Sequence, residues 1–111
     1  MHELGLCEDI VDAVARRAGD RLVSRVRVRV GVLHHVHPEA FEQSFAAAAM
    51  GTVADGACAE LVFVPVTARC GGCGVVVEAH EPVLGCATCG AVDVDQSGGD
   101  ELMLESLEYR A

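Results

Sequence analysis

The sequence predicts an α+β protein in which a small mixed sheet of three strands packs against two helices and a zinc-ribbon domain is inserted before the last strand. Two segments repeat apolar residues at helical spacing. Other segments alternate apolar and polar residues or are continuously apolar, which is typical of strands. Two Cys-x-x-Cys pairs also lie close together in the sequence. We expect residues 1–66 and 98–111 to form the α+β domain and residues 67–97 to form the zinc ribbon.

Apolar stripes predict the two helices. The stripe of the first helix is formed by Leu6, Ile10, Val11, Val14, Ala15 and Ala18. Gly19 follows as the expected C-cap, since glycine readily adopts the left-handed conformation found there. The second helix opens at Pro38, is expected to end at Gly51, and carries a stripe of Phe41, Phe45, Ala48 and Ala49.

Three segments predict the strands of the α+β domain. Residues 25–30 alternate between Arg and Val, as in a strand with one buried and one wet face. Residues 61–64 are continuously apolar, and Pro65 after them indicates an edge position or a bulge. Residues 101–109 form the expected third strand, after a turn-rich loop at 96–100. The order of the strands does not follow from the sequence.

The two Cys-x-x-Cys pairs predict one tetrahedral thiolate site. Each pair is followed by a glycine, Gly74 or Gly90, as a knuckle with positive φ requires. Because protein fills all four positions, the site is typical of a structural Zn²⁺ rather than a catalytic one. The expected ligands are Cys70, Cys73, Cys86 and Cys89.

Disulfides, unligated thiols and rubredoxin-like iron are the alternatives to zinc. An iron site is usually wrapped in aromatic side chains, whereas this chain has three Phe, one Tyr and no Trp. The segment 75–79 reads as a short strand between the pairs. Because such a ribbon buries little surface, we expect the metal to hold it folded.

Charge and composition limit the function. The formal net charge of −9 disfavours a nucleic-acid or membrane partner and suits a cation or a basic protein surface. The sequence shows no secretory signal and no apolar run long enough to span a membrane, so we expect a cytoplasmic protein. No nucleophile–base pairing is evident and the cysteine site has no open position, so we do not expect an enzyme.

The start of the chain carries a second candidate metal site. The amine of Met1, the amide of His2 and the imidazole of His2 can chelate one ion that accepts square-planar nitrogen ligands, namely Ni²⁺ or Cu²⁺. Taken alone this signal is weak, because a histidine at position 2 is usually solvated.

Several motifs in one order resemble the HypA/HybF family of hydrogenase-maturation nickel chaperones. They are the Met1-His2-Glu3 start, the Val–Arg strand, the segment 36–41, Val64-Pro65 and both cysteine pairs. The resemblance covers essentially the whole chain. It implies that nickel binds at Met1, at His2 as the essential side chain, and at Glu3 through its backbone or carboxylate. It also implies that zinc is held by Cys70, Cys73, Cys86 and Cys89.

The resemblance implies the partners as well. Nickel would be handed to the hydrogenase large subunit together with the GTPase HypB, and some family members also serve urease. The alternative is a zinc-ribbon module that takes part in protein interaction or transcription. A nucleic-acid ribbon should carry basic residues near its knuckles, but Arg69 is the sole one in this ribbon.

The remaining histidines and cysteines are weaker candidates. Three histidines before Pro38 depart from the family pattern and are extra nickel ligands or, as we favour, part of a polar loop with the last of them near a helix N-cap: His34, His35 and His37. We expect His80 to be a surface residue, and Cys7 and Cys58 to be small packed residues rather than ligands.

Overall fold

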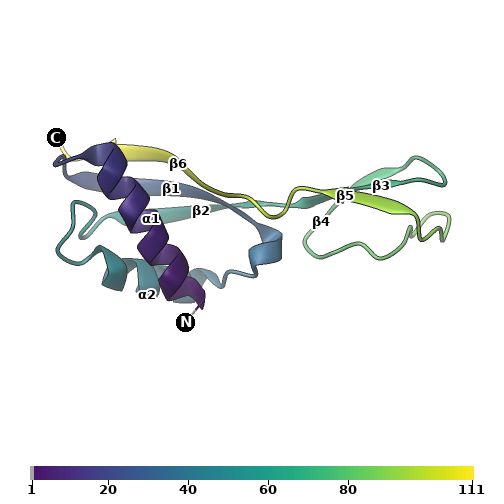
Figure 1. The fold of residues 1–111 in the computed structure, drawn as a ribbon, viewed down its shortest axis with the longest axis horizontal. Helices are drawn as coiled ribbons and strands as arrows, with labels where there is room; N and C mark the ends of the chain where they lie inside the picture. Colours follow the sequence, from purple (N-terminus) through teal and green to yellow (C-terminus); the bar gives the residue numbers. More distant parts are fainter. Residues whose placement is uncertain (1) are drawn as a thin grey trace. The chain divides into compact units, whose positions relative to one another are not determined.

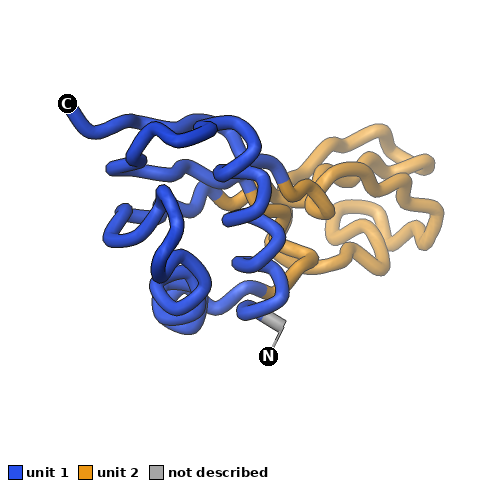
Figure 2. The backbone as a smooth tube through the Cα atoms, turned by 60° about the vertical axis from the view of Figure 1, so that its left-hand side comes forward, with its two compact units in different colours: residues 1–29, 36–62, 103–111 blue, residues 30–35, 63–102 orange. Residues whose placement is uncertain are grey.

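The computed structural model describes residues 2–111, without the side chain of His2. Its elements are α1 (His2–Ala18), β1 (Val23–Gly31), a 3-10 turn (Val32–His34), α2 (Pro38–Ala49), β2 (Cys58–Val64), β3 (Val66–Cys70), β4 (Val76–Ala79), β5 (Val94–Ser97) and β6 (Leu102–Tyr109), as Figure 1 shows. The chain divides into two compact units (Figure 2). Unit 1 comprises residues 1–29, 36–62 and 103–111, and unit 2 comprises residues 30–35 and 63–102. The domain boundaries expected at residues 66 and 98 stay a prediction.

Unit 1 is built on a sheet with the strand order β2-β1-β6. β1 and β2 run in the same direction and β6 runs in the opposite one (Figure 1), so the sheet is mixed, and the predicted α+β class is confirmed. β2 is an edge strand, which agrees with the proline directly after it. Within residues 2–111, no helix is long and apolar enough to cross a membrane.

The helix α1 and the Val–Arg strand β1 bury the apolar faces that the sequence pattern predicts. The stripe of α1 is buried, except that Ala15 is exposed, because the contact is narrower than the apolar pattern. α1 ends before Gly19, which has a φ of 65° and donates to the Ala15 carbonyl at 3.0 Å. In β1 the valine side chains face the core and are fully buried: Val26, Val28 and Val30.

The arginines of β1 form an ion-pair ladder with glutamates of the two neighbouring strands. The guanidinium–carboxylate distances are 2.7 to 3.5 Å and join Arg25, Arg27 and Arg29 to Glu60, Glu105 and Glu108. Exposed pairs of this kind add little stability individually. They do neutralise the arginine row, so this face is not a basic surface for a nucleic acid.

Unit 2 contains a second three-stranded sheet, in the order β4-β3-β5, with both pairings antiparallel. The central strand β3 buries Val66, Ala68 and Cys70 on one face. Residues 96 and 97 belong to β5, which corrects the expected loop at 96–100. The sequence did not predict this strand, because its residues Val-Asp-Gln-Ser lack a strand pattern. They become a strand by pairing with β3.

Two cysteines lie outside the paired motifs and differ in burial. Cys7 is fully buried, and its thiol donates to the Phe41 carbonyl at 3.6 Å, which links α1 to α2. Burial, and to a lesser extent the charge of Glu3, raises the pKa of Cys7 to about 11. The packed role expected for Cys7 is confirmed. The same expectation for Cys58 is wrong, because this first residue of the edge strand β2 is exposed.

The raised pKa of Cys7 predicts a loss of stability in alkali. Between about pH 9 and 11 the unfolded chain gives up this thiol proton while the folded chain keeps it, so the free energy of unfolding falls as pH rises. The slope from this group reaches about 1.4 kcal/mol per pH unit. Urea unfolding at pH 7.5 and pH 10 should show a smaller pH effect in Cys7→Ala than in the unchanged protein. Equal pH effects in the two proteins would contradict this account.

Candidate metal centre

Four sulfur atoms of unit 2 converge on one point. The ligand atoms of Cys70, Cys73, Cys86 and Cys89 all lie within 4.8 Å of one another. The Sγ–Sγ distance is 3.5 Å for Cys70 and Cys89 and 3.7 Å for Cys73 and Cys86. Four sulfurs arranged tetrahedrally at metal bonds of about 2.3 Å would be separated by about 3.8 Å. The cluster therefore has the size of a tetrahedral metal site, and its cysteines are free rather than joined in disulfides.

The two knuckles share one local geometry. In each, a glycine with a φ of 78° follows the second cysteine, and its amide donates to the carbonyl of the first cysteine. These bonds are 3.0 Å from Gly74 to Cys70 and 2.8 Å from Gly90 to Cys86. The expected positive φ at both glycines is thus confirmed.

Backbone amides prepare the first cysteine of each pair as a thiolate. The amide of Cys73 donates to the Cys70 Sγ, and the amide of Cys89 to the Cys86 Sγ, each at 3.4 Å. These bonds are the main reason why the pKa of Cys70 is lowered and that of Cys86 falls to about 6. The thiolate is the form of cysteine that binds metal. The lowered pKa of Cys70 and Cys86 therefore favours metal binding by the first cysteine of each pair.

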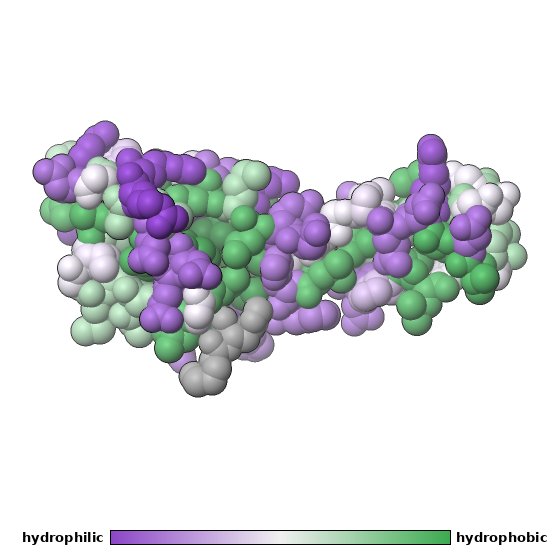
Figure 3. Space-filling view, viewed as in Figure 1, coloured by the Kyte–Doolittle hydropathy of each residue, from purple (hydrophilic) through white to green (hydrophobic). Residues whose placement is uncertain are grey.

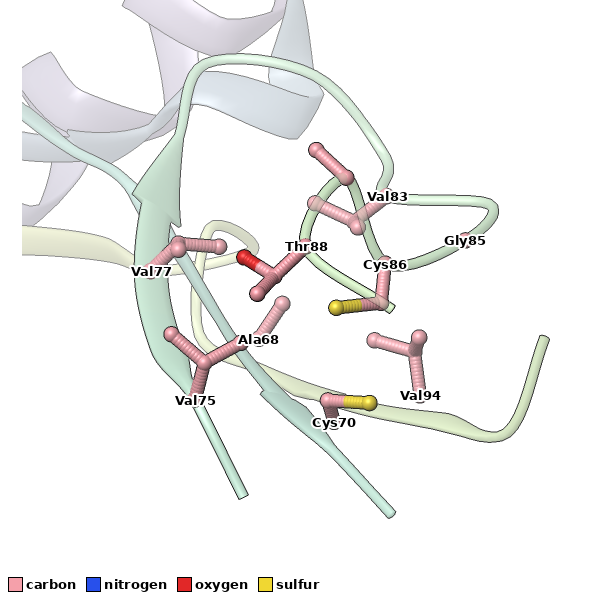
Figure 4. A pocket seen from close by; sticks show the side chains of 10 residues that line it. Ala68, Cys70, Val75, Val77, Val83, Gly85, Cys86, Thr88 and Val94 are labelled. Atoms are coloured by element: carbon pink, nitrogen blue, oxygen red, sulfur yellow. The ribbon is translucent and has the colours of Figure 1, made fainter. Parts of the chain in front are cut away.

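The site borders an apolar pocket of about 110 Å³ (Figure 4). Figure 4 shows the sulfur atoms of Cys70 and Cys86 beside it, with Ala68, Val77 and Val94 around it. This space lies between the sheet and the second knuckle, and its apolar lining forms the small interior of unit 2. Because this apolar interior is small, the expectation that a metal on the four cysteines holds the ribbon folded stays a prediction.

Gly71, inside the first pair, is a site residue that the sequence reasoning missed. Its amide donates to the Asp93 carbonyl at 2.7 Å, and a Cβ at this position would collide with the Asp93 carboxylate. A larger residue here would have to displace the exposed Asp93 side chain and would crowd the Asp93 carbonyl. The signal available in the sequence was the Gly-Gly between the two cysteines, which is more than a knuckle turn needs.

The start of the chain is described only in part. Met1 and the side chain of His2 lie outside the described residues, so their predicted nickel contacts lie outside them as well. The backbone of α1 begins at His2, and the first amides of a helix have no acceptor within it. The Glu3 carboxylate accepts from the His37 amide at 3.2 Å, which ties the start of α1 to the start of α2.

The loop histidines do not gather around one point. His37 is the N-cap of α2, where its Nδ1 accepts from the Ala40 amide at 3.5 Å, as expected. The His34 ring instead lies 2.9 Å from the Asp100 carbonyl, and His35 is exposed with a φ of 52°. His80 is exposed, as expected. Among the residues that the structure describes, the four cysteines are the one group of three or more potential metal ligands.

The fold and the site together define a small α+β protein with a zinc-ribbon-like four-cysteine metal site. The family model described as "Hydrogenase/urease nickel incorporation, metallochaperone, hypA" matches residues 1–109. The chain is 39% identical to "Hydrogenase maturation factor HypA 2" of Bradyrhizobium diazoefficiens and 35% identical to "Hydrogenase maturation factor HypA" of Trichodesmium erythraeum. These matches cover 97% of this chain, and 98% and 95% of the two relatives, respectively.

A solved structure shares the fold. The solution structure of the Ni metallochaperone HypA from Helicobacter pylori matches with a TM-score of 0.61 at 24% identity, over 100% of this chain and 99% of that one. The chain belongs to the HypA family, nickel metallochaperones of hydrogenase and urease nickel incorporation. The family resemblance drawn from the sequence is confirmed.

The geometry of the cluster predicts which cysteine substitutions lower the metal content of the protein. Cys73→Ser should lower the metal content of the purified protein and speed amide exchange at residues 66–97, because a site with three thiolates holds its ion less tightly. Amide exchange in α1 and α2 should change little. Metal content is measured by elemental analysis, and exchange by mass spectrometry.

Cys58→Ser is the matched control, since Cys58 is also exposed but lies outside the cluster. It should retain the full metal content. Full metal content in Cys73→Ser, with unchanged exchange in the ribbon, would contradict the assignment.

Proposed function

We propose that this chain binds Ni²⁺ at its N-terminus and delivers it to the large subunit of [NiFe]-hydrogenase. The ligands in this proposal are the amine of Met1, the amide and imidazole of His2, and a donor from Glu3. The observation that carries it is the start of α1 at His2. Amides at this position have no helical acceptor, so a metal can replace their protons without breaking a bond of the helix.

The contact between Glu3 and His37 supports the proposal. It includes a hydrogen bond of 3.2 Å from the His37 amide to the Glu3 carboxylate, which places the first turn of α1 beside the start of α2. A site secured at a helix end can open without disturbing the core, as delivery of an ion requires. Glu3 would then serve through its backbone as a donor and through its carboxylate as an anchor.

The four cysteines have a different role in this proposal. They bind Zn²⁺, and the ion shapes residues 67–97 as a zinc-ribbon domain, while residues 1–66 and 98–111 form the nickel-binding domain. Sulfur ligands in a closed tetrahedron favour zinc, whereas amide and imidazole nitrogens favour nickel. The two ions are thus kept apart by ligand chemistry.

Membership of the HypA family supports a proposal for the partners. We propose a HypB-type GTPase and the hydrogenase large subunit as partners, with urease maturation proteins as further ones. The paired arginines of β1 count against the alternative of a nucleic-acid-binding ribbon module. A function without catalysis of its own and a cytoplasmic location stay predictions.

The terminal chelate is tested by two changes. His2→Gln removes the imidazole and should abolish high-affinity nickel binding in calorimetry, while the zinc content stays the same. One residue added before Met1 keeps every side chain but converts the amine into an amide, and it should weaken nickel binding strongly. Binding should also weaken as pH falls through the imidazole range, because protons compete for the ligands.

His80→Gln is the matched control, since it removes an exposed imidazole from unit 2. It should bind nickel as the unchanged protein does. If the extended chain also bound nickel normally, the terminal chelate would be excluded, and His34, His35 and His37 would become the leading candidates.

A further inference from the structure

Two large apolar side chains stand in solvent beside the second knuckle. Leu84 is 86% exposed and Val92 is 85% exposed. The Cys86 amide donates to the Ala91 carbonyl at 2.8 Å, so the stretches that carry Leu84 and Val92 lie side by side. Side chains this exposed contribute almost nothing to the folding of unit 2. Large apolar side chains exposed on neighbouring backbone stretches are typical of a contact surface.

Hydrogen bonds fix the backbone on both sides of the second knuckle, next to Leu84 and next to Val92. On the Leu84 side, the Val83 amide donates to the Gln96 Oε1 at 2.7 Å. On the Val92 side, the Asp93 carbonyl accepts from the Gly71 amide at 2.7 Å. The knuckle between them is closed by its own turn and by the Cys89 amide on the Cys86 sulfur. The two apolar side chains are therefore presented on a fixed backbone, which lowers the entropy lost on binding.

The charges close to the pair in sequence are mostly negative. Residues 63–102 contain six carboxylate side chains and a single basic one, Arg69, which lies opposite Asp95 in the pairing of β3 with β5. Three of the carboxylates are exposed close to the pair in sequence: Glu81, Asp93 and Asp95. A divalent ion bound by four thiolates would leave two further negative charges at the knuckle. The surround therefore attracts cations and repels polyanions.

We propose that Leu84 and Val92, with the nearby carboxylates of Glu81 and Asp93, form a docking surface for a protein partner that presents apolar side chains among Lys and Arg residues. We call it the knuckle surface. Figure 3 shows hydrophobic side chains at the surface of unit 2, on the right of the view, next to hydrophilic ones. A second copy of this chain fits the knuckle surface poorly, because the net charge of −9 repels it.

The proposal rests on the proposed function for the choice of partners in its test. The probes are the purified HypB-type GTPase and the purified hydrogenase large subunit from the same organism as this chain. Their dissociation constants are measured by calorimetry with the full-length, metal-loaded chain and without nickel. Omitting nickel keeps this test separate from the question of the N-terminal chelate.

The double variant Leu84→Ser/Val92→Ser should weaken binding to at least one of the two probes about tenfold or more, because it removes the apolar anchors. The matched control is Leu22→Ser/Met50→Ser, which changes two exposed apolar residues of unit 1 and should leave both affinities unchanged. Both variants should retain the metal content and the nickel binding of the unchanged chain.

A charge variant tests the surround. Glu81→Lys should weaken the same complex and reduce its dependence on salt, whereas Glu8→Lys, on the exposed side of α1, should do neither. Unchanged affinity of the double variant for both probes would overturn the proposal, and so would the absence of binding by the unchanged chain. Sedimentation that shows self-association abolished by the double variant would overturn it in favour of a second copy.

Discussion

Four sulfur atoms held within 4.8 Å of one another set the condition on which the rest of unit 2 depends. The backbone favours thiolates at this point, since amides donate to the sulfurs of Cys70 and Cys86. Four thiolates so close together repel one another. The Ala91 amide lowers the pKa of Cys89, but the other three sulfurs and burial raise it on balance to about 11. A divalent cation would relieve this conflict, because it offsets two of the four thiolate charges and fills the space between the sulfurs.

The contacts at the start of α1 describe a different kind of site. Glu3 joins the first turn of α1 to the N-cap residue of α2, and one turn further along the Cys7 thiol reaches the Phe41 carbonyl. The beginning of α1 is thus placed by α2, while its first amides are left without helical partners. In the function proposed above, a nickel site of this kind can load and unload with little cost to the core. The cysteine cluster is enclosed by protein ligands and suits a permanent ion.

The sequence predicted those features that depend on local patterns. The stripe of α1, the Val–Arg alternation of β1 and the glycines after the cysteine pairs all mark conformations that neighbouring residues determine. Features that depend on distant partners were not predictable. β5 is a strand only because β3 lies beside it, and the order β2-β1-β6 has no local signature. Cys58 was misjudged because the apolar residues after it suggested burial, whereas an edge strand exposes its ends. The close contact between Gly71 and Asp93 joins residues far apart in the sequence, so a local pattern does not predict it.

The central claim is that two metal ions of different chemistry occupy two separate sites on one chain. Native mass spectrometry of the untagged protein, before and after addition of nickel, tests it most directly. The account predicts one zinc ion per chain at first, and one zinc plus one nickel ion after loading, with nickel alone lost on brief treatment with a chelator. Nickel that displaced zinc from the cysteines, with one ion per chain throughout, would contradict it.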